Sequence, residues 1–306
     1  MAQIPTEEEL LGYFDSLSNW GRWGPDDELG TLNLITPQKR LEAIGTVRDG
    51  LSIGCARPIV AEGPAADVLI PPLHFMLRSG ESPASTGSAD FLGLAFHGLT
   101  ISHVDTLGHQ FWDGQMYNGR PQSVITTEQG SMVCSVETMK DGIVTRGVLL
   151  DITKLKGKPY LDAGEAIFPA DLEAAEQAQG VRLTEGDALL VRTGWYRRRL
   201  EQGPYPVSRH RPGLHAATLP WLRERGVALI CADASQDVVP SGYERLPMPV
   251  HTIGLVAMGL CLMDACQFEE LVVESQRRGR WEFLFVVAPL RFRYATGSPT
   301  TPLAIL

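Results

Sequence analysis

The sequence is poor in cysteine and in positive charge, and both shortages argue against whole classes of protein. Its five cysteines are an odd number without a Cys-x-x-Cys pair, which disfavours a disulfide framework and a thiolate zinc site. The formal net charge of -9 argues against nucleic acid, whose phosphates require a basic face. We therefore expect no nucleic-acid partner, and we expect the cysteines to be small buried hydrophobes. They are Cys55, Cys134, Cys231, Cys261 and Cys266.

Long apolar runs are also missing. The longest, residues 253–263, is well short of the roughly 20 residues that a membrane crossing needs. Residues 1–17 carry four acidic side chains and lack the basic region and apolar centre of a secretory signal; their pattern predicts an amphipathic helix. Neither a Gly-x-Ser-x-Gly elbow nor a phosphate-cradling glycine loop occurs. We expect a cytoplasmic protein with no membrane partner and no serine-type nucleophile.

What is present is a globular composition, with 44% hydrophobic and 21% charged residues over 306 positions. This length can build one large core, and we predict a single domain over residues 1–306. Residues 1–50 are predicted to be an N-terminal helical and Trp-rich extension. Within it, residues 18–37 form an ordered loop, and Thr36 caps a helix that begins at Pro37.

Strands and helices alternate in the second half of the chain. The apolar patterns predict strands at 148–152, 187–193, 227–232 and 283–292, and helices at 169–179 and 219–225. Strands separated by helices imply parallel pairing. The predicted fold class is therefore α/β, a layered fold with a mixed sheet and helices.

Two imidazoles and one carboxylate stand close together in residues 102–109. We predict a strand over 94–101 that runs into this cluster, so that His103 and Asp105 share one face about 6.5 to 7 Å apart. Gly108 is expected to adopt a positive φ and return His109 toward the same point. An ionised Asp is costly to bury unless a cation pairs with it. The pattern predicts a metal site, the alternative being three separately hydrogen-bonded loop residues.

The ligand set offers nitrogen and oxygen but no thiolate, which suits zinc, manganese or ferrous iron. His103, Asp105 and the distant His251 could form the two-His, one-carboxylate face of an Fe(II) oxygenase. Against this, residues 252–274 contain no Lys or Arg to hold a 2-oxoglutarate co-substrate. A catalytically inactive metal-binding scaffold is a further alternative.

The stretch 99–109 resembles the motif His-x-Gly-Thr-His-x-Asp-x-Pro-x-His of the cyclase-like metal hydrolases, which include bacterial kynurenine formamidase, isatin hydrolase and cyclic imide hydrolases. His103, Asp105 and His109 keep the last three polar positions of the motif, whereas Leu99 replaces its first His and Leu107 its Pro. Further similar landmarks extend the resemblance over most of the chain; they lie at 186–195, 212–215, 221–222, 288–290 and 297–299.

The resemblance implies a swivelling β/β/α, barrel-like fold, a homodimer or homotetramer, and hydrolysis of an amide C–N bond by metal-activated water. The substrate would be a cyclic amide, an imide, a formamide or a lactone ester, and the ion Mn²⁺ or Zn²⁺. By the same resemblance, His251 and Asp264 are distal metal ligands. Leu99 in place of the first His suggests a single ion, or a second ion that is bound more weakly. His97 is expected to lie too far along the strand to substitute for that His.

In the mechanism we expect, His103, Asp105 and a distal residue hold the ion while His109 carries the proton, although His109 could also be a ligand. His215 is a weaker candidate for the acid–base role, with a structural role as its alternative. The loop 110–119 directly follows His109, so Trp112 and Tyr117 are predicted to form the wall of the substrate pocket. Trp23 is predicted to join them, with packing on the core as its alternative role.

Overall fold

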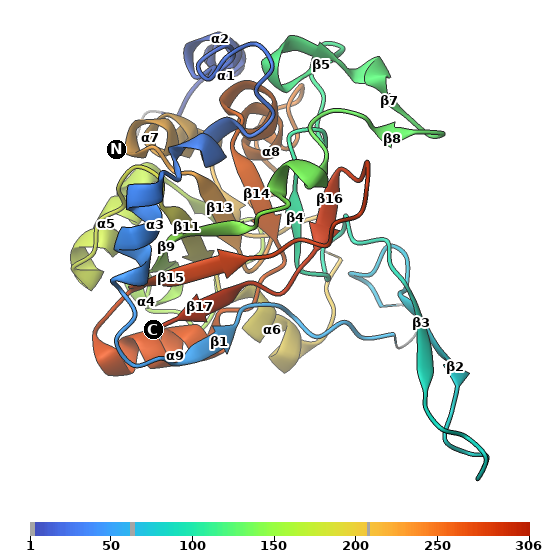
Figure 1. Ribbon diagram of the computed structural model, residues 1–306. Helices are drawn as coiled ribbons and strands as arrows, with labels where there is room; N and C mark the ends of the chain where they lie inside the picture. Colours follow the sequence, from blue (N-terminus) through green and yellow to red (C-terminus); the bar gives the residue numbers. More distant parts are fainter. Residues whose placement is uncertain (1–3, 62–64, 207–208) are drawn as a thin grey trace.

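A mixed sheet organises this protein, and its strands come from all parts of the chain. The computed structural model describes residues 4–61, 65–206 and 209–306. Within these residues the sheet has the strand order β1-β17-β15-β9-β11-β13-β14-β4-β16, and Figure 1 shows it at the centre of the molecule. In that order the strands are Ser52–Gly54, Leu303–Ile305, Glu282–Val287, Ile143–Asp151, Ala188–Arg192, Leu229–Ala232, Cys261–Asp264, His103–Asp105 and Gly297–Pro299.

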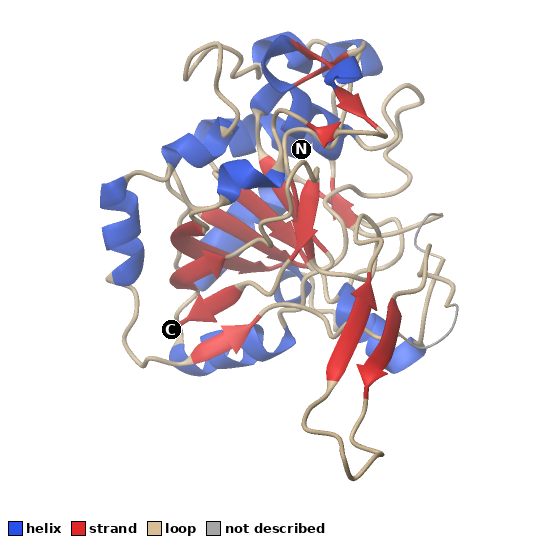
Figure 2. Ribbon diagram, turned by 45° about the vertical axis from the view of Figure 1, so that its right-hand side comes forward, coloured by secondary structure: helices blue, strands red, loops and turns tan. Residues whose placement is uncertain are grey.

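The central strands β9, β11, β13 and β14 run parallel, and the strands on both sides of them pair antiparallel. β11 and β13 are buried along their whole length, as parallel strands covered on both faces usually are. Figure 2 shows the sheet curving, with helices packed around it. The predicted α/β layered fold with a mixed sheet is confirmed.

Helices provide the crossovers between the parallel strands. α4 and α5 connect β9 to β11, α6 and α7 connect β11 to β13, and α8 connects β13 to β14. In the described part of the chain, no helix is long and apolar enough to cross a bilayer. The α-helices are α1 Glu7–Leu11, α2 Tyr13–Ser16, α3 Pro37–Ile44, α4 Ile152–Leu155, α5 Pro169–Gln179, α6 Trp195–Gln202, α7 Leu219–Arg225, α8 Pro249–Ile253 and α9 Glu269–Arg278.

Smaller elements complete the fold. The two-stranded ladders pair β2 Leu73–Arg78 with β3 Ala89–Gly93, β5 Gln115–Met116 with β6 Arg120–Pro121, β7 Ile125–Thr126 with β8 Gly130–Ser131, and β10 Ala166–Ile167 with β12 Gly213–Leu214. The short 3-10 turns are η1 Gly30–Leu34, η2 Tyr117–Gly119, η3 Gln122–Val124, η4 Val136–Met139 and η5 Ala216–Thr218, and η6 Gly254–Met258 is a π-helical turn.

Most of the predicted helices are found where the sequence places them. α5 and α7 have the predicted bounds, and the Thr36 hydroxyl accepts a hydrogen bond from Lys39 N at 3.1 Å at the start of α3. The helix predicted over 1–17 is instead two short helices, α1 and α2, on either side of Gly12. Its first three residues lie outside the described part.

The predicted strands differ more from the structure. β9 begins five residues earlier than predicted, and β15 ends at Val287 rather than at 292. The strand predicted over 94–101 is wrong: these residues form an irregular loop, and only the three residues of β4 are extended. All five cysteines are free and buried, as predicted.

The hairpin of β2 and β3 extends away from the rest of the protein as an arm (Figures 1 and 2). All six residues of β2 are exposed, so neither of its faces is covered. Phe75 and Phe91 stack across the arm with ring centroids 4.8 Å apart. The arm also carries His74, whose ring lies 2.8 Å from Asp90 and takes no part in the cluster around Asp105.

The N-terminal segment packs against the turn that follows α8. Asn19 Nδ2 donates to the Met258 carbonyl at 2.7 Å, and Trp20 Nε1 donates to the Val256 carbonyl at 2.6 Å. Both carbonyls belong to η6, which continues directly from α8. The extension is therefore hydrogen-bonded to the turn that continues from α8.

Candidate metal centre

The register between two neighbouring strands builds the first part of the site. β4 and β14 are antiparallel, with His103 opposite Asp264 and Asp105 opposite Leu262. Side chains at directly opposed positions point to the same face of a sheet, and so do residues two apart on one strand. His103, Asp105 and Asp264 therefore share one face, and all three side chains are buried.

His251 reaches this face from α8. Its Nε2 lies 3.2 Å from Asp264 Oδ2 and 4.0 Å from Asp105 Oδ2. Asp237 fixes the ring from behind, because its carboxylate lies 2.5 Å from His251 Nδ1 and also accepts hydrogen bonds from the backbone of Val250 and His251. The Asp237 carboxylate thus binds both the backbone at the start of α8 and the ring of His251.

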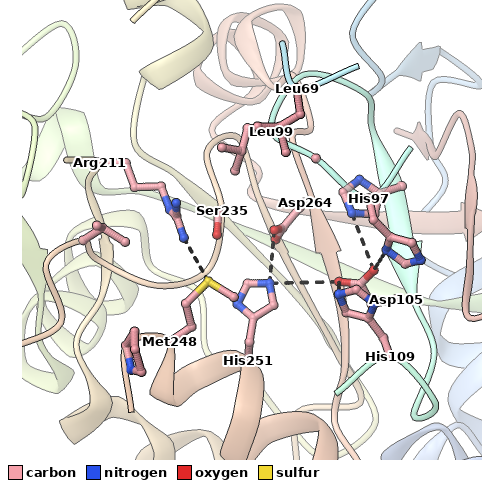
Figure 3. Close-up of a pocket in the computed structure, with 14 residues that line it drawn as sticks. Leu69, His97, Leu99, Asp105, His109, Arg211, Ser235, Met248, His251 and Asp264 are labelled. Atoms are coloured by element: carbon pink, nitrogen blue, oxygen red, sulfur yellow. Dashed lines mark hydrogen bonds and ion pairs between the residues drawn. The ribbon is translucent and has the colours of Figure 1, made fainter. Parts of the chain in front are cut away.

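Two more imidazoles come from the loops on either side of β4. His97 and His109 stack with ring centroids 4.0 Å apart and planes only 7° from parallel. His97 Nδ1 lies 2.9 Å from Asp105 Oδ1, and His109 Nε2 lies 4.0 Å from Asp105 Oδ2. Figure 3 shows both rings beside the Asp105 carboxylate. One ligand atom each from His97, Asp105 and His109 lies within 4.8 Å of the others.

Hydrogen bonds behind three of the rings turn one nitrogen of each toward Asp105. His103 Nδ1 donates to the Ile101 carbonyl at 2.7 Å, which leaves Nε2 facing Asp105 at 3.5 Å. His97 Nε2 contacts the Thr296 hydroxyl at 3.0 Å, and Asp237 holds Nδ1 of His251. Metal-binding histidines are typically oriented in this way by a partner on the nitrogen that does not bind the metal.

The charged groups of the site shift the pKa values of Asp105 and His251 in opposite directions. Burial alone would raise the pKa of Asp105, but the imidazoles of His109, His103 and His97 outweigh it and the pKa is lowered. Burial alone would lower the pKa of His251, yet the carboxylates of Asp264 and Asp237 raise it well above its ordinary value. The buried carboxylates therefore attract positive charge, which a proton on His251 or a divalent ion between the groups can provide.

An ion fits the atoms that converge here. His97 Nδ1 and Asp105 Oδ1 face each other at 2.9 Å without the geometry of a hydrogen bond, and within the described residues neither buried atom has a hydrogen-bond partner. Imidazole nitrogens and carboxylate oxygens that converge without satisfying one another are the donor set of a zinc or manganese site. The residues present thus fit a divalent ion.

A cavity of about 430 Å³ opens beside the cluster (Figure 3). His97, His103, Asp105, His109, His251 and Asp264 line one part of it. The rest of its wall is mostly apolar, with Arg211 and Ser235 as polar members; the apolar lining side chains are Leu69, Leu99, Val239, Pro247 and Met248. The cavity can take a small molecule with an apolar body next to the cluster.

The comparisons with known proteins agree with this geometry. A family model described as a putative cyclase matches residues 59–236, more than half of the chain. The chain belongs to the cyclase family. A crystal structure of a novel cyclase is 31% identical and superposes with a TM-score of 0.86, covering 95% of this chain and all of that one. The comparison with curated proteins found no match.

More distant members of the structural neighbourhood share the fold. An isatin hydrolase bound to the product analogue thioisatinate is 16% identical with a TM-score of 0.60, covering 89% of this chain and 99% of that chain. Isatin hydrolase A from Labrenzia aggregata, bound to benzyl benzoate, is 19% identical with a TM-score of 0.58, covering 88% and 98%. At these identities the likeness concerns the fold alone.

In this member of the family, the structure brings together all five residues predicted as metal ligands. His103, Asp105, His109, His251 and Asp264 line the same cavity. Of these five, His251 and Asp264 are the farthest in sequence from the motif at 99–109. His251 Nε2 nevertheless lies 4.0 Å from Asp105, although 146 positions separate the two residues. Which of them bind an ion stays a prediction.

The residues predicted to wall the pocket lie elsewhere. Tyr117 is fully buried in the core and donates to Asp27 at 2.9 Å, while Trp112 stacks on Phe14 with ring centroids 4.9 Å apart. Trp23 packs on the core beneath the guanidinium of Arg22. None of the three predicted wall residues lines the cavity beside the cluster. The loop after His109 turns away and packs against the N-terminal helices.

His215 is also separate from the cluster. Its Nδ1 accepts a hydrogen bond from Ala217 N at 3.1 Å, and its ring stacks on Phe168. Burial lowers the pKa of this imidazole. His215 does not line the cavity beside the cluster, so the structure gives it a capping role at η5 and no access to a substrate there.

Gly108 is needed for a reason other than the predicted one. It does not adopt a positive φ. Instead, a Cβ at this position would lie 2.7 Å from Ser131 Oγ and 3.1 Å from the Cys134 carbonyl. The absence of a side chain lets the turn before His109 pack directly against the segment around residues 131–134.

His97 is the site residue that the sequence-based prediction missed. On the predicted strand over 94–101, it was expected to lie too far along to substitute for the histidine that Leu99 replaces. The loop instead brings His97 back beside Asp105. Gly93 and Gly98 on either side of this segment were the available signal, since glycine within an apparent strand marks a bend.

Proposed function

We propose that this protein is a metal-dependent hydrolase that cleaves an amide C–N bond of a small molecule. Cyclic amides, imides and formamides are the substrate classes, with a lactone ester as the oxygen counterpart. The observation that carries this proposal is the convergence of four imidazoles and two carboxylates on one cavity with an otherwise mostly apolar wall. The name isatin hydrolase, given to structures of the same fold, supports it.

The residues we assign to the ion are His97, His103, Asp105, His251 and Asp264. Their mixed nitrogen and oxygen donors suit Mn²⁺ or Zn²⁺. When bound, such an ion polarises a carbonyl group and lowers the pKa of a bound water to about 7. Asp105 occupies the central place, because three of the imidazoles and the ring of His251 all lie within 4.0 Å of its carboxylate.

His109 is the residue we assign to proton transfer. Burial lowers its pKa to about 4, with Asp105 offsetting part of the effect, so the ring is neutral at pH 7 and can accept a proton. Its side chain is 23% exposed, whereas those of His103 and His251 are 4% exposed or less. Within the described residues, no hydrogen bond orients the ring of His109 from behind. A neutral, accessible imidazole can take a proton from water and return it to the departing nitrogen.

The two alternative functions, an Fe(II) oxygenase and an inactive metal-binding scaffold, differ in what they require of the site. The Fe(II) oxygenase would use His103, Asp105 and His251, which do lie close together, but three further donors surround them. Such an oxygenase keeps open positions on its ion for oxygen and co-substrate, whereas this cluster is rich in competing ligands. The inactive scaffold would bind metal and turn over nothing.

The test is a substrate panel with purified, metal-supplemented protein. Elemental analysis gives the bound ion and its stoichiometry, and mass spectrometry follows lactams, imides, formamides and lactones, with Asp105→Asn as the inactive control. Activity that a chelator removes and Mn²⁺ or Zn²⁺ restores would support the proposal. Metal binding without turnover would favour the scaffold, and oxygen consumption would favour the oxygenase.

The proposal includes an oligomer, with the β2–β3 arm as the contact between copies of this chain. A two-stranded hairpin without a covered face is marginally stable in water. The arm and its base nevertheless expose a series of large apolar side chains: Leu69, Ile70, Leu73, Phe75, Met76, Leu77, Phe91 and Leu92. A second copy of the chain that packs on the arm would cover these side chains. This contact would form the expected homodimer or homotetramer.

A further inference from the structure

The loop that carries His97 is not held by the sheet. In the described part of the chain, no backbone-to-backbone hydrogen bond fixes residues 97–101, and strand pairing begins only at His103. His97 Nδ1 nevertheless lies 2.9 Å from Asp105 Oδ1, and Figure 3 shows its ring directed at this carboxylate. Contacts from side chains must therefore fix the loop.

Arg57 supplies such contacts at two points of the segment between His97 and His103. Its Nη1 donates to the Leu99 carbonyl at 3.0 Å, and its backbone N–H donates to Ser102 Oγ at 2.9 Å. Leu99 lies two residues after His97, and Ser102 directly precedes His103. One arginine thus binds both the loop itself and the place where the loop joins β4.

The other donors of this guanidinium bind the centre of the sheet. Nε donates to the Cys266 carbonyl at 3.3 Å, and Nη2 donates to the Asp233 carbonyl. Asp233 directly follows β13, and Cys266 lies two residues after the end of β14. A guanidinium carries its N–H groups in a fixed plane, so it can bridge three separate carbonyls, which the single ammonium of a lysine cannot do.

Helix α6 covers this bridge from outside. The Cζ atom of Arg57 lies 5.0 Å from the centroid of the Tyr196 ring, and the Leu99 side chain packs on the cluster formed by Trp195 and Ala234. Arg57 itself is only 6% exposed. A buried guanidinium is costly unless its N–H groups are hydrogen-bonded, so burial favours the geometry in which the three carbonyls stay bound.

We propose that Arg57 is a positioning residue of the metal centre. It ties the loop at Leu99 to the ends of β13 and β14, so that the His97 ring is held facing Asp105. Arg57 does not line the cavity, and it therefore acts on the site through Leu99 and His97. This inference rests on the proposed function, because it takes His97 as a ligand of the ion.

The test is a double-mutant cycle between Arg57 and His97 in metal affinity. Protein stripped with a chelator is titrated with Zn²⁺ and with Mn²⁺ in a calorimeter, as wild type, Arg57→Met, Arg57→Lys, His97→Ala and the double variant Arg57→Met, His97→Ala. Arg225→Met is the matched control. The Arg225 side chain is 16% exposed and its Cζ lies 5.0 Å from the Trp221 ring centroid, but it pairs with Glu176 on α5.

Arg57→Met should weaken the binding of either ion by about 10- to 100-fold, the range for a residue that orients a ligand. Arg57→Lys should lose less, because an ammonium can still bind the Leu99 carbonyl. In the His97→Ala background Arg57→Met should cause no further loss, since the ring through which Arg57 acts is gone. Arg225→Met should bind both ions as wild type does.

Limited chymotrypsin digestion of the metal-free protein gives a second readout that needs no ion. Cleavage after Phe96 and Leu99, identified by mass spectrometry, should be faster in Arg57→Met than in wild type, because the loop opens more often. Cleavage after Phe75 on the exposed arm is the internal reference. Arg57→Lys takes the place of Arg57→Met in both measurements if the methionine variant does not fold.

Two results would overturn the assignment. Arg57→Met could bind both ions as tightly as Arg225→Met, or it could lose as much affinity in the His97→Ala background as in wild type, so that it does not act through His97. If wild type binds neither ion, the proposed metal-dependent function fails. The digestion then decides the role of Arg57, because unchanged cleavage after Phe96 and Leu99 would show that it does not fix the loop.

Discussion

Replacing His97 with alanine should weaken the binding of a divalent ion by at least about 100-fold. Loss of a residue that only supports a ligand typically costs 10- to 100-fold in metal affinity, so loss of a direct ligand should reach the upper end of that range or exceed it. A factor of 100 is about 2.7 kcal/mol of binding free energy. His97 qualifies as a ligand because its Nδ1 faces Asp105 at 2.9 Å while Thr296 holds the other nitrogen.

The same loss should appear in thermal unfolding. With the ion at about 100 times the wild-type Kd, binding stabilises wild type by about 2.7 kcal/mol and the His97→Ala variant by only about 0.4 kcal/mol. For 306 residues the unfolding entropy is about 0.6 kcal/mol/K, so the difference of about 2.3 kcal/mol corresponds to roughly 4 °C in Tm. The variant should therefore lose most of the metal-induced shift in Tm.

The assay is calorimetry with and without a chelator, together with competition against a fluorescent metal indicator. His74→Ala is the matched control, because His74 pairs with an aspartate on the exposed arm and lies outside the cluster. The difference between the two variants in metal-induced shift isolates the contribution of His97. If His97→Ala binds the ion as tightly as His74→Ala, the assignment of His97 as a ligand is refuted.

Three further predictions concern the site, its packing and the assembly. His103→Ala should lose metal and activity together, whereas His109→Ala should keep the ion and lose about 10² to 10⁴-fold in turnover; if elemental analysis finds both variants free of metal, His109 is a ligand. Gly108→Ala should lower the free energy of unfolding by about 1 to 3 kcal/mol in urea titrations, because the added Cβ overpacks the turn. The double variant Phe75→Asp, Phe91→Asp should be monomeric in light scattering. A wild-type protein that is itself monomeric would contradict the proposal that the arm is the contact between copies.

The central part of the fold could be predicted from the sequence because local pattern and burial agree there. The helix at 169–179 has a proline at its start and a glycine after its end, and the structure has the same bounds. Parallel strands read as continuous apolar runs, which is how β11 and β13 appear. The segment 94–101 has a similar composition, but among the described residues it pairs with no strand, so tertiary context overrides its β-propensity.

The sequence predicted which polar side chains of residues 102–109 lie together, but it did not predict where the aromatic side chains of the next loop pack. His103 and Asp105 share a face because strand geometry requires it, and this depends on no other part of the chain. The destination of an aromatic side chain depends on which surface its loop meets. Tyr117 and Trp112 are large enough to fill the core beside the N-terminal helices, and no pattern within residues 110–119 distinguishes that outcome from a pocket wall.

The pairing of β4 with β14 also sets the time at which an ion can bind during synthesis of the chain. Asp264 reaches His103 only through this antiparallel register, so the complete donor set does not exist until residue 264 has left the ribosome and β14 has added to the sheet. A slip of one residue would turn Asp264 to the other face. Metal uptake should therefore be a late event that reports correct strand pairing, and a chain that ends before α8 should leave Asp105 without His251 and Asp264.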